Sequence, residues 1–256
     1  MPARQARRAI LAGVLKPVVW YETEPCIEGL DNLAGLRGPV IFVSNHASHL
    51  DATLLLCSLP KGFRHRTAVG AASDYFFDVW WRYAATALAF NAFPVDRTSA
   101  RRMIATARGL IEDGWSLVLF PEGTRSPDGW VHEFHRAPAS LCVQLGIPAV
   151  PVGIRGNYAA MPRGRSWPVP GRAPVAVRYG RALSSGPGEH ARSFNERVYK
   201  EVARLWDEDA TTWWESLQRA ERNETPDPTG PEGARWRRIW EGSRPLDSRR
   251  RRSLWS

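Results

Sequence analysis

Two short polar segments, 45–51 and 120–126, carry residue types that could do acid–base chemistry and bind an anion. The first reads Asn-His-Ala-Ser-His-Leu-Asp, which places the carboxylate of Asp51 five positions after the imidazole of His46. At that spacing the carboxylate can accept a hydrogen bond from one ring nitrogen and leave the other to take a proton from an alcohol. A His-Asp pair that only caps a helix is the simpler alternative for this segment taken alone.

The second segment reads Phe-Pro-Glu-Gly-Thr-Arg-Ser and follows the apolar run 116–120. Gly123 permits a tight turn whose backbone amides can face an anion, and Arg125 can hold a phosphate with two parallel hydrogen bonds. Glu122 and Thr124 add a carboxylate and a hydroxyl to the same turn. A plain turn after a strand remains the alternative if these residues are considered one by one.

Arg97 is a third candidate, because it ends the segment 93–97, Phe-Pro-Val-Asp-Arg, at the close of an expected strand. An arginine there could give a phosphate a second contact. A surface ion pair with Asp96 or Glu112 explains the residue equally well.

Two other chemistries fit the same segments less well. His46, His49 and Asp51 could ligate zinc, but their spacing matches no common zinc pattern, and 132–135 places two histidines three positions apart rather than four. Ser48 could be a covalent nucleophile, but the chain has no G-x-S-x-G elbow around it. We therefore expect neither a metal nor an acyl-enzyme.

The composition bounds the class of protein. The chain has 256 residues, 43% of them hydrophobic, which is enough for one sizeable α/β core. Its net charge is +9 and only three of its cations are lysines, so the excess is arginine, which suits phospholipid head groups or nucleic acid or reflects a biased genome. The three cysteines form no C-x-x-C pattern, which favours a reducing, cytoplasmic environment.

Apolar patterns predict the elements that position the two segments. The expected strands are 40–43, 88–95, 116–120, 149–154 and 175–177. The expected helices begin at Asp51, at Ser99 and near 136, and an aromatic-rich helix covers 73–84. Alternation of strands and helices predicts a single α/β domain with a largely parallel or mixed sheet flanked by helices. Both polar segments then follow strands, at the sheet edge where such folds place their sites.

The C-terminal third contains one more expected helix and then a change of composition. Ser193 and Glu196 have capping-box spacing, so we expect a long helix from Ser193 whose apolar stripe continues through Trp213 and Leu217. Residues 222–256 are rich in proline, glycine and arginine, which predicts a basic, mostly disordered tail in which 236–240 could form a short helix.

Residues 1–22 form a basic amphipathic pattern at near-helical spacing. Such a helix can lie in a membrane interface, with aromatic side chains at the head groups, or can cover the core as an ordinary helix. No stretch reaches 18 uninterrupted apolar residues, so we expect any membrane attachment to be peripheral.

Taken together, the segments 45–51, 93–97, 120–126 and 147–152 occur in the order and at the spacings of four known sequence blocks. Over roughly 25–185 the chain resembles the lysophosphatidic acid acyltransferases (1-acylglycerol-3-phosphate acyltransferases) of glycerolipid synthesis. The resemblance implies a glycerol-3-phosphate acyltransferase-like domain at 23–221. It implies His46 as general base with Asp51 as its orienting partner. The other implied site residues are the phosphate-binding Arg97, Glu122, Gly123, Thr124 and Arg125, and Pro148 and Pro151 in the acyl-donor region.

The resemblance also implies the reaction. A fatty acyl group would move from acyl-CoA or acyl-carrier protein to the free hydroxyl of lysophosphatidate, without an acyl-enzyme, cofactor or metal. The protein would work as a peripheral protein at the cytoplasmic face of an anionic membrane, and nucleic acid is not an expected partner. Another lysophospholipid or polar-lipid acceptor, or a non-catalytic basic module that binds membrane or nucleic acid, stays open. The family commonly has Phe-Lys where this chain has Phe134 and His135, which leaves His135 without a role.

Overall fold

The computed structural model describes residues 2–72, 91–95, 100–233 and 236. Arg97, the expected helix at 73–84 and the first part of the expected strand 88–95 lie outside the described residues. Of the described residues 91–95, Phe93–Val95 form a strand within the predicted range.

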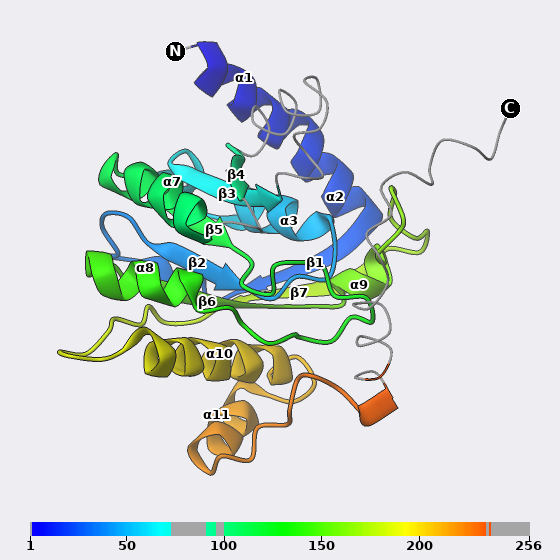
Figure 1. Ribbon diagram of the computed structural model, residues 1–256. Coiled ribbons are helices and arrows are strands. Elements are labelled where there is room, and N and C mark those ends of the chain that lie inside the picture. Colours follow the sequence, from blue (N-terminus) through cyan, green and yellow to red (C-terminus); the bar gives the residue numbers. More distant parts are fainter. Residues whose placement is uncertain (1, 73–90, 96–99, 234–235, 237–256) are drawn as a thin grey trace, which may run out of the picture.

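The centre of the molecule is a mixed sheet of seven strands in the order β1-β7-β6-β2-β5-β3-β4 (Figure 1). Strands β6, β2, β5, β3 and β4 run parallel to one another, whereas β7 is antiparallel to β6 and parallel to β1. The expected α/β class with a largely parallel or mixed sheet is thus confirmed. The strands are β1 Thr23–Glu28, β2 Ile41–Ser44, β3 Thr67–Ala72, β4 Phe93–Val95, β5 Ser116–Leu119, β6 Ala149–Arg155 and β7 Ala173–Tyr179.

Helices cover both faces of this sheet, because the central strands are apolar on both sides. Phe42 of β2 joins the cluster formed with α3 and the N-terminal helices, and Ile41 joins the cluster formed with α7, α8 and α10. The helices are α1 Pro2–Ile10, α2 Lys16–Glu22, α3 Leu50–Ser58, α4 Lys61–Arg64, α7 Ala100–Glu112, α8 Ala137–Leu145, α9 Asn157–Ala160, α10 Ala191–Asp207 and α11 Trp213–Glu221, with a π-helical turn at Leu11–Leu15 and a 3-10 turn at Leu30–Leu33.

The N-terminal segment 2–22 is helical throughout, and one of its stripes packs on the core. Leu11 and Val19 are 2% and 4% exposed, so this stripe covers the sheet as an ordinary helix would. Val14 and Tyr21 on other faces are 54% and 77% exposed. No helix among the described residues is long and apolar enough to cross a membrane.

The predicted capping box at Ser193 is wrong. Helix α10 begins at Ala191, and the hydroxyl of Ser193 donates to the carbonyl of His190 at 2.9 Å instead of capping an amide. A side-chain cap is found instead at Thr212, the residue before α11. Its hydroxyl accepts from the backbone amide of Glu215 at 3.2 Å. The expected long helix is therefore two helices.

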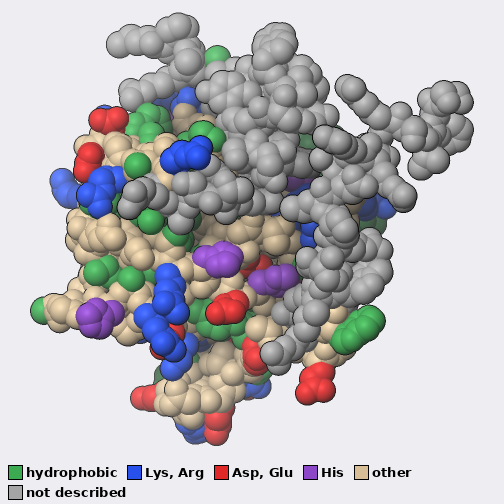
Figure 2. Space-filling view, in the orientation of Figure 1, with side chains coloured by type: hydrophobic (Ala, Val, Ile, Leu, Met, Phe, Trp, Pro, Cys, Tyr) green, Lys and Arg blue, Asp and Glu red, His purple; other side chains and the backbone are tan. Residues whose placement is uncertain are grey.

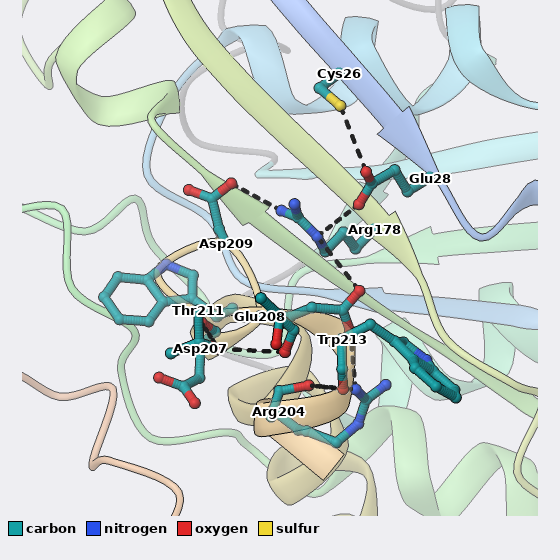
Figure 3. Close-up of polar contacts among 12 residues, drawn as sticks. Cys26, Glu28, Arg178, Arg204, Asp207, Glu208, Asp209, Thr211 and Trp213 are labelled. Carbon is teal, nitrogen blue, oxygen red and sulfur yellow. Dashed lines mark hydrogen bonds and ion pairs between the residues drawn. The ribbon is translucent and has the colours of Figure 1, made fainter.

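An ion-pair network explains why α10 ends at Asp207 (Figure 3). Just past that end, Glu208 and Asp209 turn towards Arg178 of β7, with distances of 3.6 and 2.9 Å to its guanidinium. Arg204 bonds Glu208 at 2.9 Å and the hydroxyl of Ser216 in α11 at 3.0 Å. These contacts stabilise the bend at 208–212, although the apolar stripe of the sequence continues across it.

The described beginning of the tail is not a free chain, which corrects its expected start at 222. Pro228 is buried, and its carbonyl accepts a hydrogen bond from the amide of Val131 at 3.0 Å. The folded part of the chain therefore extends beyond 222. Residues 237–256 lie outside the described residues, and their disorder stays a prediction.

Candidate active site

The segment 45–51 starts directly where β2 ends and is fixed there by Asn45. The side chain of Asn45 donates to the carbonyl of Ile154 and accepts from its amide, both at 2.8 Å. Because Ile154 lies in the neighbouring strand β6, this pair of bonds ties the motif to the sheet before the chain turns away.

His46 and Asp51 form the contact that their spacing predicts. The Nδ1 atom of His46 lies 2.8 Å from Oδ2 of Asp51, whose side chain is fully buried. The same Oδ2 accepts from the backbone amides of Ala47 and Ser48, both at 2.9 Å. Since two fixed amides already donate to this oxygen, it acts as an acceptor, which places the proton of the ring on Nδ1 and leaves Nε2 as the basic nitrogen.

Asn157 is a further member of the site that the sequence does not reveal. Its Nδ2 donates to the other carboxylate oxygen of Asp51, Oδ1, at 2.7 Å, and both side chains are buried. Asn157 begins the four-residue helix α9, just after β6 ends at Arg155. The carboxylate is thus held from both sides, which fixes the plane in which it meets His46.

The imidazole of His46 lies at the surface edge of this arrangement. It stacks on Phe120 with ring centroids 4.1 Å apart and planes 20° apart, and 20% of its side chain is exposed. Figure 2 shows histidine side chains near the middle of the face that it draws, with acidic side chains beside them. The buried carboxylate and the stacked Phe120 ring together orient an imidazole that is partly open to solvent.

The second polar segment lies against the first because β2 and β5 are neighbouring parallel strands, with Val43 opposite Leu119. The amide of His46 donates to Oε1 of Glu122 at 2.8 Å, and the carbonyl of His46 accepts from the amide of Ser126 at 2.7 Å. The buried carboxylate of Glu122 therefore joins the anion-binding turn to the backbone of the candidate base.

Gly123 and Arg125 give this turn its shape and charge. Gly123 has φ of +71°, a conformation that favours glycine, and is exposed at the surface of the turn. Arg125 is half-buried, as is Thr124 between them. Burial lowers the pKa of His49 to about 4, and the nearby positive charge of Arg125 is the second cause. His49 is therefore neutral at pH 7, and Arg125 carries the positive charge on the side of the turn that faces the 45–51 segment.

His135 lies beside the same turn. Its amide donates to the carbonyl of Pro121 at 2.9 Å, and a Cβ added to Gly123 would lie 3.3 Å from its ring. The sequence pattern gave this histidine no role, and the structure places its ring next to the anion-binding turn.

The two prolines expected near the acyl donor do not come to the site together. The carbonyl of Pro148 accepts from the amide of Ile41 at 3.1 Å, at the start of β2, whereas His46 follows the end of that strand. At about 3.3 Å per residue, Pro148 is roughly 17 Å from His46 along the strand direction. Pro151 is buried in the middle of β6, opposite Val43. Pro148 therefore lies at the opposite end of the sheet from the base.

The structure also bears on the alternative chemistries. Ser48 is fully buried, and its hydroxyl donates to the carbonyl of Met161 at 3.0 Å and accepts from the amide of Leu50 at 3.2 Å. This hydroxyl holds the loop and does not face a substrate. Within the described ranges, no group of three or more histidine, cysteine or carboxylate side chains is arranged to hold a metal ion.

Comparisons with known proteins show the family of the chain. A family model described as acyltransferase matches residues 24–155, just over half of the chain. The chain is 32% identical over 141 residues to the chloroplastic 1-acyl-sn-glycerol-3-phosphate acyltransferase LPAT1 of Arabidopsis thaliana, covering 54% of this chain and 38% of that protein. It is 30% identical over 148 residues to the chloroplastic 1-acyl-sn-glycerol-3-phosphate acyltransferase BAT2 of Brassica napus, covering 57% of this chain and 40% of that protein. The chain thus spans less than half the length of these curated relatives.

A solved structure resembles the whole fold. The crystal structure of the 1-acyl-sn-glycerophosphate acyltransferase PlsC from Thermotoga maritima matches with a TM-score of 0.64 and 26% identity, covering 82% of this chain and 83% of that one. Both polar segments of the candidate site, 45–51 and 120–126, fall inside the range that the family model matches. The chain therefore belongs to the acyltransferase family, as the order and spacing of its motifs predict.

Proposed function

We propose that this protein transfers a fatty acyl group from a thioester to the free hydroxyl of lysophosphatidate, giving phosphatidate. The observation that carries the proposal is the junction of the two motifs. The base His46, oriented by Asp51 at 2.8 Å, is joined through its own amide to Glu122 of the arginine-bearing turn, also at 2.8 Å. A base and an anion site at one sheet edge suit an acceptor that carries both a hydroxyl and a phosphate. The relatives, which are 1-acyl-sn-glycerol-3-phosphate acyltransferases, supply the acceptor class.

In the proposed reaction, Nε2 of His46 removes the proton of the acceptor hydroxyl as its oxygen attacks the thioester carbonyl. The tetrahedral intermediate then collapses, the carbon–sulfur bond breaks, and the imidazolium returns the proton to the leaving thiolate. General-base assistance of this kind is typically worth about 10²–10⁴ in rate. The hydroxyl of Ser48 is buried and makes two hydrogen bonds, which supports direct transfer rather than an acyl-enzyme.

The turn at 122–125 would hold the acceptor's phosphate. Arg125 would supply the charge and a bidentate hydrogen bond, and the glycine backbone would let the phosphate approach closely. His49 is neutral next to Arg125 at pH 7, so Arg125 and not His49 would supply the positive charge there. Arg97 remains a predicted second contact, and acyl-CoA and acyl-carrier protein remain the two proposed donors.

The proposed site of action is the cytoplasmic surface of a membrane, with the protein bound peripherally. The N-terminal helices support this, because their buried stripe faces the core while Val14 and Tyr21 stay exposed. Exposed apolar and aromatic side chains on the same helical segment as the exposed, basic Arg8 are what an interfacial helix presents to anionic lipid.

An acceptor panel tests the proposal. Thiol release from palmitoyl-CoA is measured with lysophosphatidate, with glycerol 3-phosphate, with lysophosphatidylcholine and without acceptor, and the lipid products are identified. We expect release that depends on lysophosphatidate and gives phosphatidate. Thiol release that depends only on another acceptor would show that lysophosphatidate is not the substrate. If no acceptor stimulates thiol release from palmitoyl-CoA or palmitoyl-carrier protein, a non-catalytic binding module would be favoured instead.

A further inference from the structure

The C-terminal segment 224–230 crosses the loop that follows the anion-binding turn. The carbonyl of the buried Pro228 accepts from the amide of Val131 at 3.0 Å. Gly230 lies directly on the indole of Trp130, so that a Cβ added there would run into the ring, and its φ is +78°. The segment is therefore fitted to this loop by one backbone hydrogen bond and by one position that only glycine can occupy.

The loop under this segment, 126–135, is tied to the candidate site at both of its ends. The amide of Ser126 donates to the carbonyl of His46 at 2.7 Å, and the amide of His135 donates to the carbonyl of Pro121 at 2.9 Å. Between these ends, the hydroxyl of Tyr158 in α9 holds the carbonyl of Pro127 at 2.7 Å. A displacement of the loop would therefore move the turn that carries Arg125.

On its other side Trp130 belongs to a chain of ring contacts that leads back to the sheet. Trp130 lies 5.5 Å from Trp206 of α10, and the guanidinium of Arg155 lies 4.1 Å from the ring of Trp206. Arg155 also donates to the carbonyl of Trp206 at 3.2 Å. Arg155 ends β6 directly after Ile154, the residue that holds Asn45. The loop is thus positioned between the C-terminal segment and the strand end that fixes the catalytic motif.

We propose that the segment 224–230 is a brace for the loop 126–135 and that Gly230 and Pro228 are positioning residues for the anion-binding turn. The brace lies outside the family-matched range 24–155, so neither the motifs nor the family match assigns it. It acts on Arg125 through the loop, whereas the contact between His46 and Asp51 is held separately by Asn157 and two backbone amides. The expected effect of the brace on acceptor binding rests on the proposed function. Its expected effect on the position of the loop does not depend on which reaction the protein catalyses.

The test compares Gly230→Ala with Gly188→Ala in the full-length protein. Both glycines have a positive φ, +78° and +72°, but a Cβ at Gly230 would enter the ring of Trp130, while one at the exposed Gly188 meets nothing within 4 Å, so the second variant is a matched control for backbone strain. Amide hydrogen exchange should become at least about tenfold faster at Val131 in Gly230→Ala and stay unchanged in Gly188→Ala. Unchanged exchange in both variants would overturn the brace, whatever reaction the protein catalyses.

Kinetics supply the second readout. Gly230→Ala should raise the KM for the lysophospholipid acceptor roughly tenfold, because small displacements of binding groups are costly, while the KM for the acyl donor and kcat change less than about twofold. In a Trp130→Ala background the Gly230→Ala change should raise the acceptor KM much less, since the ring it displaces is gone and only the strain of its positive φ remains. Additive effects, or equal losses for donor and acceptor, would contradict action through Trp130. A wild-type protein inactive with every acceptor would refute the proposed function but not the exchange result.

Discussion

Replacement of Asp51 by asparagine or by alanine should have very different consequences. The backbone amides of Ala47 and Ser48 both donate to Oδ2 of Asp51, so they will turn the carboxamide oxygen of Asp51→Asn, and not its NH₂, towards His46. The Nδ1–H tautomer is then kept and the charge is lost, while the side-chain amide of Asn157 must turn over to present its oxygen to the new NH₂ group. A hydrogen bond to a charged group exceeds a neutral one by about 1–2 kcal/mol, which corresponds to a roughly five- to thirtyfold fall in kcat.

Asp51→Ala removes the acceptor altogether. His46 is then not oriented, and most of the roughly 10²–10⁴-fold contribution of the base should be lost. The backbone amides of Ala47 and Ser48 and the side-chain NH₂ of Asn157 also lose their hydrogen-bond acceptor. The free energy of unfolding should therefore fall by about 2–4 kcal/mol.

The assay for both variants is phosphatidate formation at saturating donor and acceptor, with urea unfolding on the same preparations. Asp113→Asn is a matched control, because it removes a carboxylate at an exposed position. Equal losses of kcat in Asp51→Asn and Asp51→Ala would refute the argument that two fixed amides set the orientation of the side chain and thereby the tautomer of His46.

Two further predictions concern residues near the pair. Asn157→Leu removes the 2.7 Å hydrogen bond to Oδ1 of Asp51 and should lower kcat about tenfold and the free energy of unfolding by about 1–3 kcal/mol, and wild-type values for both would contradict the assigned contact. His49 has a folded-state pKa lowered to about 4, against about 6.5 when unfolded, so its neutral form favours folding above pH 6.5 and that stability is lost as the pH falls towards 4. The acid side of a plot of unfolding free energy against pH should therefore be shallower in His49→Gln, and an identical slope would show that His49 is not buried neutral.

The core of the site could be predicted because its geometry follows from local spacing and strand order. Asp51 is in the first turn of α3 and His46 is at the end of β2, so their contact depends on only a few residues of chain. The meeting of the two motifs follows from parallel neighbouring strands. Asn157 could not be predicted, because its contact with Asp51 spans 106 residues and α9 is a single short turn without a motif.

The missed elements have similar physical reasons. Strand β1 is an edge strand with alternating burial and contains Pro25, and β3 consists largely of small residues, so neither shows the β-branched run typical of a buried strand. The apolar stripe from α10 into α11 continues in helical register, and only the ion pairs of Arg178 and Arg204 reveal the bend between them. Pro148 belongs to the sequence block 147–152, but its place in that block does not reveal that β6 begins at the end of the sheet opposite His46.

The role of His46 as general base is tested most directly by the kcat of His46→Ala for acyl transfer to lysophosphatidate, beside His190→Ala as an exposed control. The account predicts a loss of at least about 10²-fold for His46→Ala, with an unfolding transition close to that of the wild type, and full activity for His190→Ala. Near-normal transfer by a folded His46→Ala protein would contradict the account.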